Sequence, residues 1–195
     1  MDDDFDIYLA SSSPRRRELL DQIGVRYRLI NIAIPETPKE GESAQAFVLR
    51  MAMEKAQAGK GYQGINTHKP VLGADTAVVV DNDILGKPRN RSDALSMLAR
   101  LSGRWHEVIS AVALIGETSA TRVNISRVHF RQISDAECEN YWQTGEPKDK
   151  AGAYGIQGKA AIFINELQGS YSAVMGLPLY ETSELLEQAG IAVWR

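Results

Sequence analysis

The chain has 195 residues, of which 44% are hydrophobic and 24% charged, with 16 glycines, 7 prolines and a formal net charge of −3. This composition excludes a disordered or collagen-like protein, and the length favours one domain or two closely joined lobes. No run approaches the roughly 18 apolar residues of a membrane-spanning helix, and residues 1–4, Met-Asp-Asp-Asp, are acidic where a signal peptide would be basic. We therefore expect a cytoplasmic protein that has no membrane partner.

Cysteine and histidine are scarce. Cys138 is the single cysteine, so it cannot form an internal disulfide, and its predicted helix favours an inert packing residue over a nucleophile. His68, His106 and His129 stand far apart without zinc-ligand spacing, so a structural zinc site is not expected. The 25 acidic residues against 22 basic ones give no reason to expect a nucleic-acid surface.

In the first half of the chain, apolar runs of strand length alternate with helical patterns. The predicted elements are a strand at 7–10, a helix at 14–23, an apolar run at 27–34, a loop at 35–38, a helix at 44–58 and a strand at 71–80. Pro14 at the first helical position, Ser13 before it and Gly24 after the helix are typical boundaries. A turn at 81–83 leads into Ile84-Leu85, which predicts a hairpin.

The second half continues the alternation. It predicts a helix at 92–101, two strands at 108–115 and 120–130 that pair antiparallel, a helix ending at Trp142, a strand at 160–164, a helix at 179–188 and a short strand at 191–194. Ser134 with Glu137 three residues later is a capping-box pattern. This order predicts an α/β fold, in which a mixed twisted β-sheet is flanked by helices.

The segment Ser11-Ser12-Ser13-Pro14-Arg15-Arg16 is the first candidate site. The start of a helix presents unpaired N–H groups and the positive end of its dipole, so it can bind an anion. Serine hydroxyls add donors, and arginines add charge in a fork suited to phosphate. The alternative is a serine cap followed by solvated arginines. Because arginine is unfavourable at this end of a helix, we favour the anion site.

Asp75 is the second candidate, in Gly73-Ala74-Asp75-Thr76 within an otherwise apolar strand. A carboxylate in such a strand is costly unless it has a partner or a function, and the glycine allows a ligand or backbone to approach. Asp75 is therefore either a general base or metal ligand, or a buried aspartate satisfied by a nearby turn. This segment leaves the two interpretations even.

Several charged residues indicate a functional site only when they are taken together. Lys55, Lys87 and Glu36 would each be read alone as exposed surface residues. Together, Glu36 and Asp75 offer oxygen ligands for Mg²⁺ or a similar hard cation, and the lysines with Arg15 can neutralise phosphates. Phosphoryl or nucleotidyl transfer needs such a set.

The glycine-rich segment at 149–158 is the last candidate. Its glycines let the backbone wrap closely around a ligand, while Tyr154 offers a stacking surface and Gln157 an amide that can read a base edge. It is not the dinucleotide-binding fingerprint, because the glycine spacing differs and the segment precedes a predicted strand. A tight structural turn is the alternative.

Several motifs occur together in one order. They are Leu-Ala-Ser-Ser-Ser-Pro-Arg-Arg at 9–16, Glu-Lys-Ala at 54–56, Gly-Ala-Asp-Thr at 73–76, Gly-Lys-Pro at 86–88, Leu-Ser-Gly at 101–103, Asp-Lys-Ala-Gly-Ala-Tyr-Gly-Ile-Gln-Gly at 149–158 and Val-Met-Gly-Leu-Pro at 174–178. In this order they resemble the Maf family, from about residue 7 to residue 186. Several independent motifs in one order are far more specific than any one of them.

The resemblance implies one Maf-like domain over residues 1–195, with the Maf/Ham1 (ITPase-like) fold and two lobes around a cleft. It implies a house-cleaning nucleoside triphosphate pyrophosphatase that hydrolyses free nucleoside triphosphates between the α- and β-phosphates. A divalent metal, Mg²⁺ or Mn²⁺, and a homodimer are also implied. The family has been associated with arrest of septum formation, so one alternative function is a nucleotide-sensing regulator of cell division without significant hydrolysis. The other alternative is a 7-methyl-GTP pyrophosphatase.

The resemblance also implies residue roles. Asp75 matches the proton acceptor and, with Glu36, the metal site. The phosphate-binding positions match Ser11, Ser13, Arg16, Lys55 and Lys87. Arg15, Thr76 and Gln157 match the specificity positions of the branch that acts on dTTP and UTP, where the 7-methyl-GTP branch carries Trp, Gln and Glu.

Overall fold

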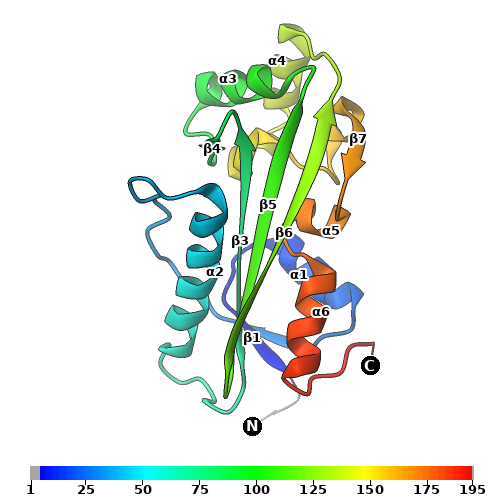
Figure 1. Ribbon diagram of the computed structural model, residues 1–195. Helices are drawn as coiled ribbons and strands as arrows, with labels where there is room; N and C mark the ends of the chain where they lie inside the picture. The colour runs from blue at the N-terminus through cyan, green and yellow to red at the C-terminus, as the bar shows by residue number, and fades with distance from the viewer. Residues whose placement is uncertain (1–4, 195) are drawn as a thin grey trace. The chain divides into compact units, whose positions relative to one another are not determined.

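The structure, a computed structural model, describes residues 5–194, so the acidic residues 1–4 lie outside the described part of the chain. The helices are α1 (Pro14–Gln22), α2 (Ala44–Lys60), α3 (Arg91–Leu101), α4 (Asp135–Gln143), α5 (Tyr171–Met175) and α6 (Leu179–Gln188) (Figure 1). The strands are β1 (Ile7–Leu9), β2 (Tyr27–Leu29), β3 (Val71–Val80), β4 (Asp83–Leu85), β5 (Trp105–Ile115), β6 (Ser119–Phe130) and β7 (Ile164–Gln168). Short 3₁₀ helices follow α4: η1 (Glu146–Asp149), η2 (Ala151–Ala153) and η3 (Lys159–Phe163).

The seven strands of the described residues form one mixed sheet in the order β2-β1-β3-β5-β6-β7, with β4 paired to β3. β1 runs parallel to β2 and to β3, whereas β4 is antiparallel to β3 and β7 to β6. β5 and β6 are neighbours joined only by residues 116–118, and a link this short requires an antiparallel pair. The mixed sheet with its helices confirms the predicted fold class.

The chain divides into two compact units. Among the described residues, the first unit holds residues 5–75, 110–124 and 176–194, and the second holds residues 76–109 and 125–175. The first unit therefore contains β1, β2, α1, α2 and α6, and the second contains β4, β7, α3, α4 and α5. β3 leaves the first unit directly after Asp75.

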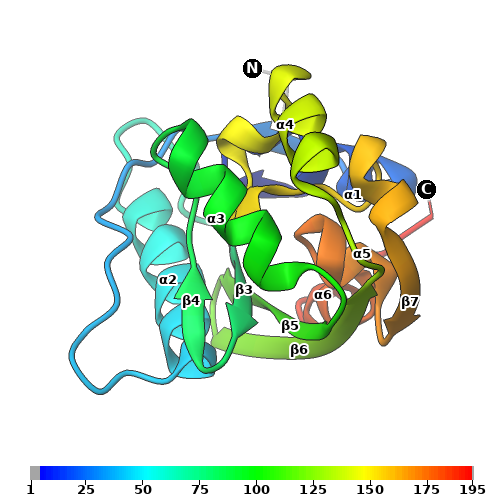
Figure 2. The same ribbon diagram turned by 90° about the horizontal axis from the view of Figure 1, so that it is seen from above.

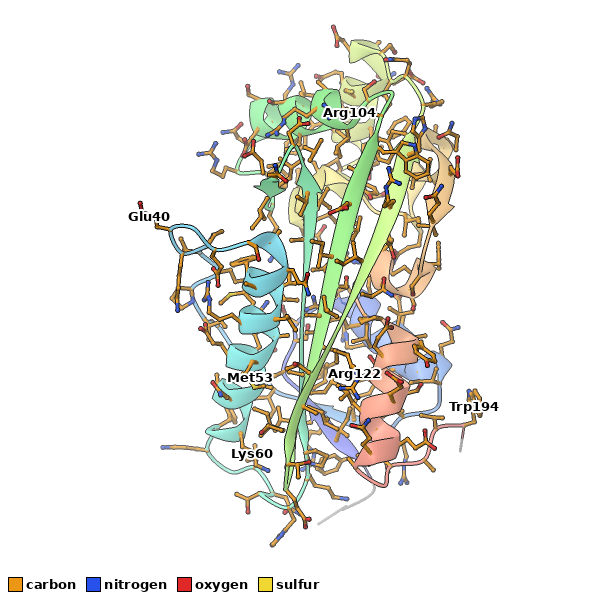
Figure 3. The ribbon with its side chains drawn as sticks, in the orientation of Figure 1. Glu40, Met53, Lys60, Arg104, Arg122 and Trp194 are labelled. Atoms are coloured by element: carbon orange, nitrogen blue, oxygen red, sulfur yellow. The ribbon has the colours of Figure 1, made fainter. Side chains whose placement is uncertain are left out.

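In the first unit, α2 and α6 lie on opposite sides of the strands (Figure 1). Helix α2 touches β3, because a Cβ placed on Gly73 would lie 2.3 Å from the carbonyl oxygen of Ala52. Helix α6 is tied to β6 by an ion pair of 3.3 Å between Arg122 Nε and Glu184, and Figure 3 shows Arg122 between these two elements. The same view places Lys60 at the C-terminal end of α2, where its ammonium donates to the carbonyl of Thr67 at 2.6 Å.

In the second unit, α3 and α4 lie side by side, as Figures 1 and 2 show. The guanidinium of Arg91 on α3 donates to the carboxylate of Glu139 on α4. Beneath them lies a core of buried side chains that includes Leu98, Phe130 and Phe163. This unit therefore has its own hydrophobic core.

Local sequence signals placed several boundaries. Helix α1 begins at Pro14 as predicted, and the capping box at Ser134 and Glu137 is confirmed with both of its hydrogen bonds. The turn after β3 has positive φ at Asp81 and Asn82, 53° and 65°, which is the signature of a type I′ hairpin turn. None of the helices described combines the length and hydropathy that a bilayer crossing requires.

Two predicted strands are wrong. Residues 159–163 form η3, and β7 begins only at Ile164. Ala160 and Phe163 are both buried, and their spacing of three suits a 3₁₀ turn, which a short apolar run does not distinguish from a strand. Residues 191–194 contain no strand either, and the N–H of Trp194 donates to the carbonyl of Ile23 after α1. Of the apolar run at 27–34, only Tyr27–Leu29 forms a strand, and α5 is a single unpredicted turn.

Candidate functional site

A lysine bridges two carboxylates in the first unit. Lys55 Nζ lies 2.5 Å from Glu36 Oε1 and 2.7 Å from Asp75 Oδ1. Lys55 and Asp75 are buried, at 8% and 7% exposure, while the Glu36 side chain is 40% exposed. Three residues that the sequence spreads over 40 positions, from 36 to 75, therefore form one cluster that is open to solvent on the Glu36 side.

The approach of α2 to β3 places the lysine. Ala52, Lys55 and Ala56 share one buried face of α2, at the spacing that aligns side chains along a helix. Gly73 lies two residues before Asp75 and so on the same face of β3, where its missing side chain lets the α2 backbone come close. The φ of Gly73 is not positive, so its backbone conformation does not require a glycine. The close contact with α2 does.

Opposing effects act on the pKa of Asp75, and the net shift is upward. Burial raises the pKa of this carboxyl, while the positive charges of Lys55 and Arg16 work in the opposite direction. Asp75 therefore has a buried ionic partner and is also a stronger base than a solvent-exposed aspartate. Lys55 is thus the partner that a satisfied buried aspartate requires, and the Asp75 carboxylate can still act as a general base or metal ligand.

The first turn of α1 holds a half-buried arginine, Arg16. Arg16 Nη1 donates to Ser11 Oγ at 3.1 Å, and Arg16 Nε donates to the carbonyl oxygen of Gly176 at 2.8 Å. Burial lowers the pKa of Arg16, and the charges of Asp75 and Glu36 oppose that shift. Arg16 therefore belongs to the electrostatic surroundings of the Lys55 cluster and is not a solvated surface charge.

The serine cap that was the alternative for this loop is not formed. Ser13 stands at the N-cap position of α1, but its side chain makes no capping hydrogen bond. Its backbone N–H donates instead to Ser11 Oγ, at 3.2 Å. The first turn of α1 also has no acidic side chain to offset the helix dipole. These features leave the start of α1 suited to an anion.

Four other predicted site residues lie at separate places in the two units. Arg15 is half-buried in the first turn of α1, in the first unit. Thr76 follows Asp75 on β3 and is the first residue of the second unit. Lys87 is exposed between β4 and α3, and Gln157 is exposed in the turn at 155–158, both in the second unit. The roles assigned to these four residues stay predictions.

Tyr154 does not provide the predicted stacking surface. It is only 5% exposed, and its hydroxyl lies 2.8 Å from Nε2 of the buried His106. Its ring packs edge-on against Phe130, with centroids 4.8 Å apart. The tyrosine is a core residue of the second unit.

The sequence interpretation missed an arginine that holds the loop around Glu36. Residues 30–43 contain no helix or strand, yet Arg50 on α2 donates from Nε and Nη2 to the two carboxylate oxygens of Glu42, at 2.6 Å each. Arg50 Nη2 also donates to the carbonyl of Thr37, at 3.1 Å. The arginine thus fixes the residue next to Glu36. No periodicity signals this pair, since Glu42 lies outside the helix.

The two carboxylates fit a hard divalent cation. Mg²⁺ takes oxygen ligands and commonly uses one or two carboxylates, with waters and substrate phosphates completing its shell. Within residues 5–194, no group of three or more His, Cys, Asp or Glu side chains is placed to hold a metal ion. Glu36 and Asp75 therefore suit a metal that arrives with a phosphate ligand better than one bound by protein alone.

Comparisons with known proteins agree with this chemistry. The family model described as Maf-like protein matches residues 6–189. A dTTP/UTP pyrophosphatase of Alkalilimnicola ehrlichii is 54% identical over 187 residues, which cover 93% of this chain and 92% of the relative. A dTTP/UTP pyrophosphatase of Saccharophagus degradans is 48% identical over 196 residues, covering 100% and 93%. A solved nucleoside-triphosphatase / dITP/XTP pyrophosphatase from Mycobacterium abscessus has a TM-score of 0.45 at 18% identity, and the match covers 95% of this chain and 94% of that chain.

Proposed function

The chain belongs to the Maf family, and from that membership we propose that it hydrolyses dTTP and UTP to the nucleoside monophosphate and pyrophosphate. Relatives about half identical to it over nearly their full length are named dTTP/UTP pyrophosphatases. The observation that carries the proposal is the Lys55 bridge between Glu36 and Asp75. It places a buried carboxylate beside fixed positive charge, as water attack on a phosphate requires.

Asp75 is the proposed general base. Its carboxylate accepts a proton from a water while the water oxygen bonds to the α-phosphorus, and the bond from this phosphorus to the bridging oxygen breaks to release pyrophosphate. Burial raises the pKa of Asp75, which makes its carboxylate a better proton acceptor.

Lys55 and Arg16 supply positive charge for the phosphate oxygens, and Ser11 fixes the guanidinium of Arg16 through its hydroxyl. Ser13 and Lys87 take phosphate-binding roles in the proposal because they match the family motifs. A second set, proposed on the same basis to select the base, consists of Arg15, Thr76 and Gln157.

Glu36 and Asp75 would hold the divalent metal, Mg²⁺ or Mn²⁺. When bound, it would neutralise negative charge on the phosphate oxygens during attack. Glu36 is the more exposed of the two carboxylates, so it can meet a metal that enters with the nucleotide. Asp75 stays fixed by Lys55, which keeps its carboxylate in one orientation.

A substrate panel tests the proposal. Pyrophosphate release is measured with Mg²⁺ for the common ribo- and deoxyribonucleoside triphosphates and for 7-methyl-GTP, and we expect dTTP and UTP to have the highest kcat/KM. Asp75→Asn should lower kcat by about 10²- to 10⁴-fold with the fold retained, because the amide cannot accept the proton. Asp83→Asn is the matched control, since Asp83 lies on β4 and its side chain is 68% exposed.

The panel also distinguishes the alternatives. Absence of dTTP and UTP turnover would refute the proposal, and near-wild-type kcat in Asp75→Asn would show that the base lies elsewhere. Nucleotide binding without hydrolysis would favour the sensing regulator. A preference for 7-methyl-GTP would place the chain in the other branch of the family.

A further inference from the structure

The turn that carries Gln157 is held on both sides by side chains from outside it. The N–H of Gly155, two residues before Gln157, donates to Tyr141 Oη at 3.3 Å. The N–H of Lys159, two residues after it, donates to Glu146 Oε2 at 2.9 Å. The turn itself is closed by the N–H of Gly158, which donates to the carbonyl of Gly155 at 3.0 Å.

The two holding side chains are joined to each other. Tyr141 Oη donates to Glu146 Oε1 at 2.7 Å, so one connected pair contacts both ends of the turn. Tyr141 is anchored in the core of the second unit, where it is 4% exposed and packs edge-on against Phe163. Burial and the neighbouring Glu146 raise the pKa of Tyr141, so its hydroxyl stays a neutral donor. The turn is thus fastened to a rigid core.

Two glycines of this turn lie close to the side chains of Glu146 and Lys150. A Cβ on Gly158 would lie 2.1 Å from Glu146 Oε1, and a Cβ on Gly155 would lie 2.8 Å from Lys150 Cε. Lys150 in turn donates from Nζ to the carbonyl of Glu146, at 2.7 Å. Neither glycine has a positive φ, so close approach and not backbone conformation explains them.

We propose that Tyr141 and Glu146 are positioning residues that fix the backbone around Gln157 and thereby set the discrimination between nucleobases. This inference rests on the proposed function, in which the exposed Gln157 amide contacts the base. An amide presents a donor and an acceptor from one planar group, so it selects between bases only if its backbone is held in one place. Glu146 Oε1 accepts a hydrogen bond from Tyr141, and Glu146 Oε2 accepts one from the N–H of Lys159. Both carboxylate oxygens therefore take part in holding the turn.

Glu146→Gln tests the proposal, because an amide of the same size cannot accept both hydrogen bonds. With kcat and KM measured for the full substrate panel, we expect kcat/KM for dTTP and UTP to fall about tenfold, mainly through KM. The kcat/KM values of the poor substrates should change little, so the ratio of kcat/KM between dTTP or UTP and the other nucleotides should fall. Tyr141→Phe should lower this ratio in the same way. Glu139→Gln is the matched control on α4, since Glu139 pairs with Arg91 and should leave the panel unchanged.

Two further measurements separate positioning from a general loss of structure. Gln157→Ala alone should narrow the preference, and adding Glu146→Gln to it should have little further effect, because both act through one contact. Amide hydrogen exchange at Gly155 and Lys159 should accelerate in Glu146→Gln while the core amides stay protected. An equal fall in kcat/KM for all nucleotides, or an unchanged preference, would overturn the proposal.

The wild-type panel keeps the two proposals apart. If the wild type prefers a nucleotide other than dTTP or UTP, the proposed function is wrong. A narrowing of whatever preference it has in Glu146→Gln would still support the positioning role. If the wild type prefers dTTP and UTP and both variants keep that preference, the positioning role alone is refuted.

Discussion

Gly73→Ala is expected to damage stability and catalysis through one displacement. The added Cβ would lie 2.3 Å from the carbonyl oxygen of Ala52 and 2.6 Å from the backbone nitrogen of Ala56, both on α2. Ordinary contacts of a carbon atom lie at about 3.5–4.0 Å, so the helix and the strand must separate by about 1 Å. Backbone atoms cannot rotate away as a flexible side chain can.

The magnitude follows from this separation. Overpacking of this kind costs about 1–3 kcal/mol. In a chain of this size each kcal/mol lowers Tm by about 2–4 °C, so a fall of about 2–12 °C is expected. Lys55 moves with α2, and its 2.7 Å hydrogen bond to Asp75 would lengthen past the roughly 3.2 Å limit of a normal hydrogen bond. A misplacement of about 1 Å at a reacting group can cost about 10²-fold in rate.

Thermal unfolding followed by circular dichroism, together with kcat for dTTP measured well below Tm, checks both effects. Gly61→Ala is the matched control at the end of the same helix, because its Cβ would have only ordinary contacts, at 3.7 Å or more, and its φ is −83°. A Gly73→Ala variant with wild-type Tm would refute the close contact of α2 with β3. A lowered Tm with full kcat would refute the dependence of Asp75 on the position of Lys55.

Two other predictions concern Arg50 and His106. Arg50→Lys removes the fork that holds Glu42 and the carbonyl of Thr37, so the Mg²⁺ concentration for half-maximal dTTP hydrolysis should rise about tenfold with little change in kcat. An unchanged Mg²⁺ requirement would contradict a role for this loop in metal binding. Burial lowers the pKa of His106 from 6.5 to about 3, so between these values the unfolded chain binds a proton that the folded protein does not. Stability should therefore fall with acidification in this window, by up to ~1.4 kcal/mol per pH unit, and urea unfolding of His106→Gln should show a weaker pH dependence; an equal pH dependence would refute this assignment.

Where a structural feature is decided by neighbours in the chain, the sequence predicted it. Pro14 starts α1, Ser134 and Glu137 form the capping box, and the polar turn at 81–83 makes the hairpin. Each depends on hydrogen bonds or backbone angles within about four residues. The predicted strands were wrong at 160–163 and at 191–194, where short apolar runs fit more than one local structure and packing against distant residues decides between them.

The candidate site shows the same division. The sequence by itself identified Glu36, Lys55 and Asp75 as chemically suited to phosphate and metal, because residue type fixes charge and ligand preference. Only the tertiary structure showed that one ammonium bridges the two carboxylates, since this depends on how closely α2 approaches β3.

Burial likewise depends on contacts that are distant in sequence. Tertiary packing decided that Arg16 donates to the carbonyl of Gly176 and that Tyr154 lies in the core. It also placed Tyr141 and Glu146 around the Gln157 turn, through hydrogen bonds between segments that the sequence interpretation had treated separately. The sequence determined which groups are available for chemistry, and the packing of helices on strands determined which of them meet and which are withdrawn from water.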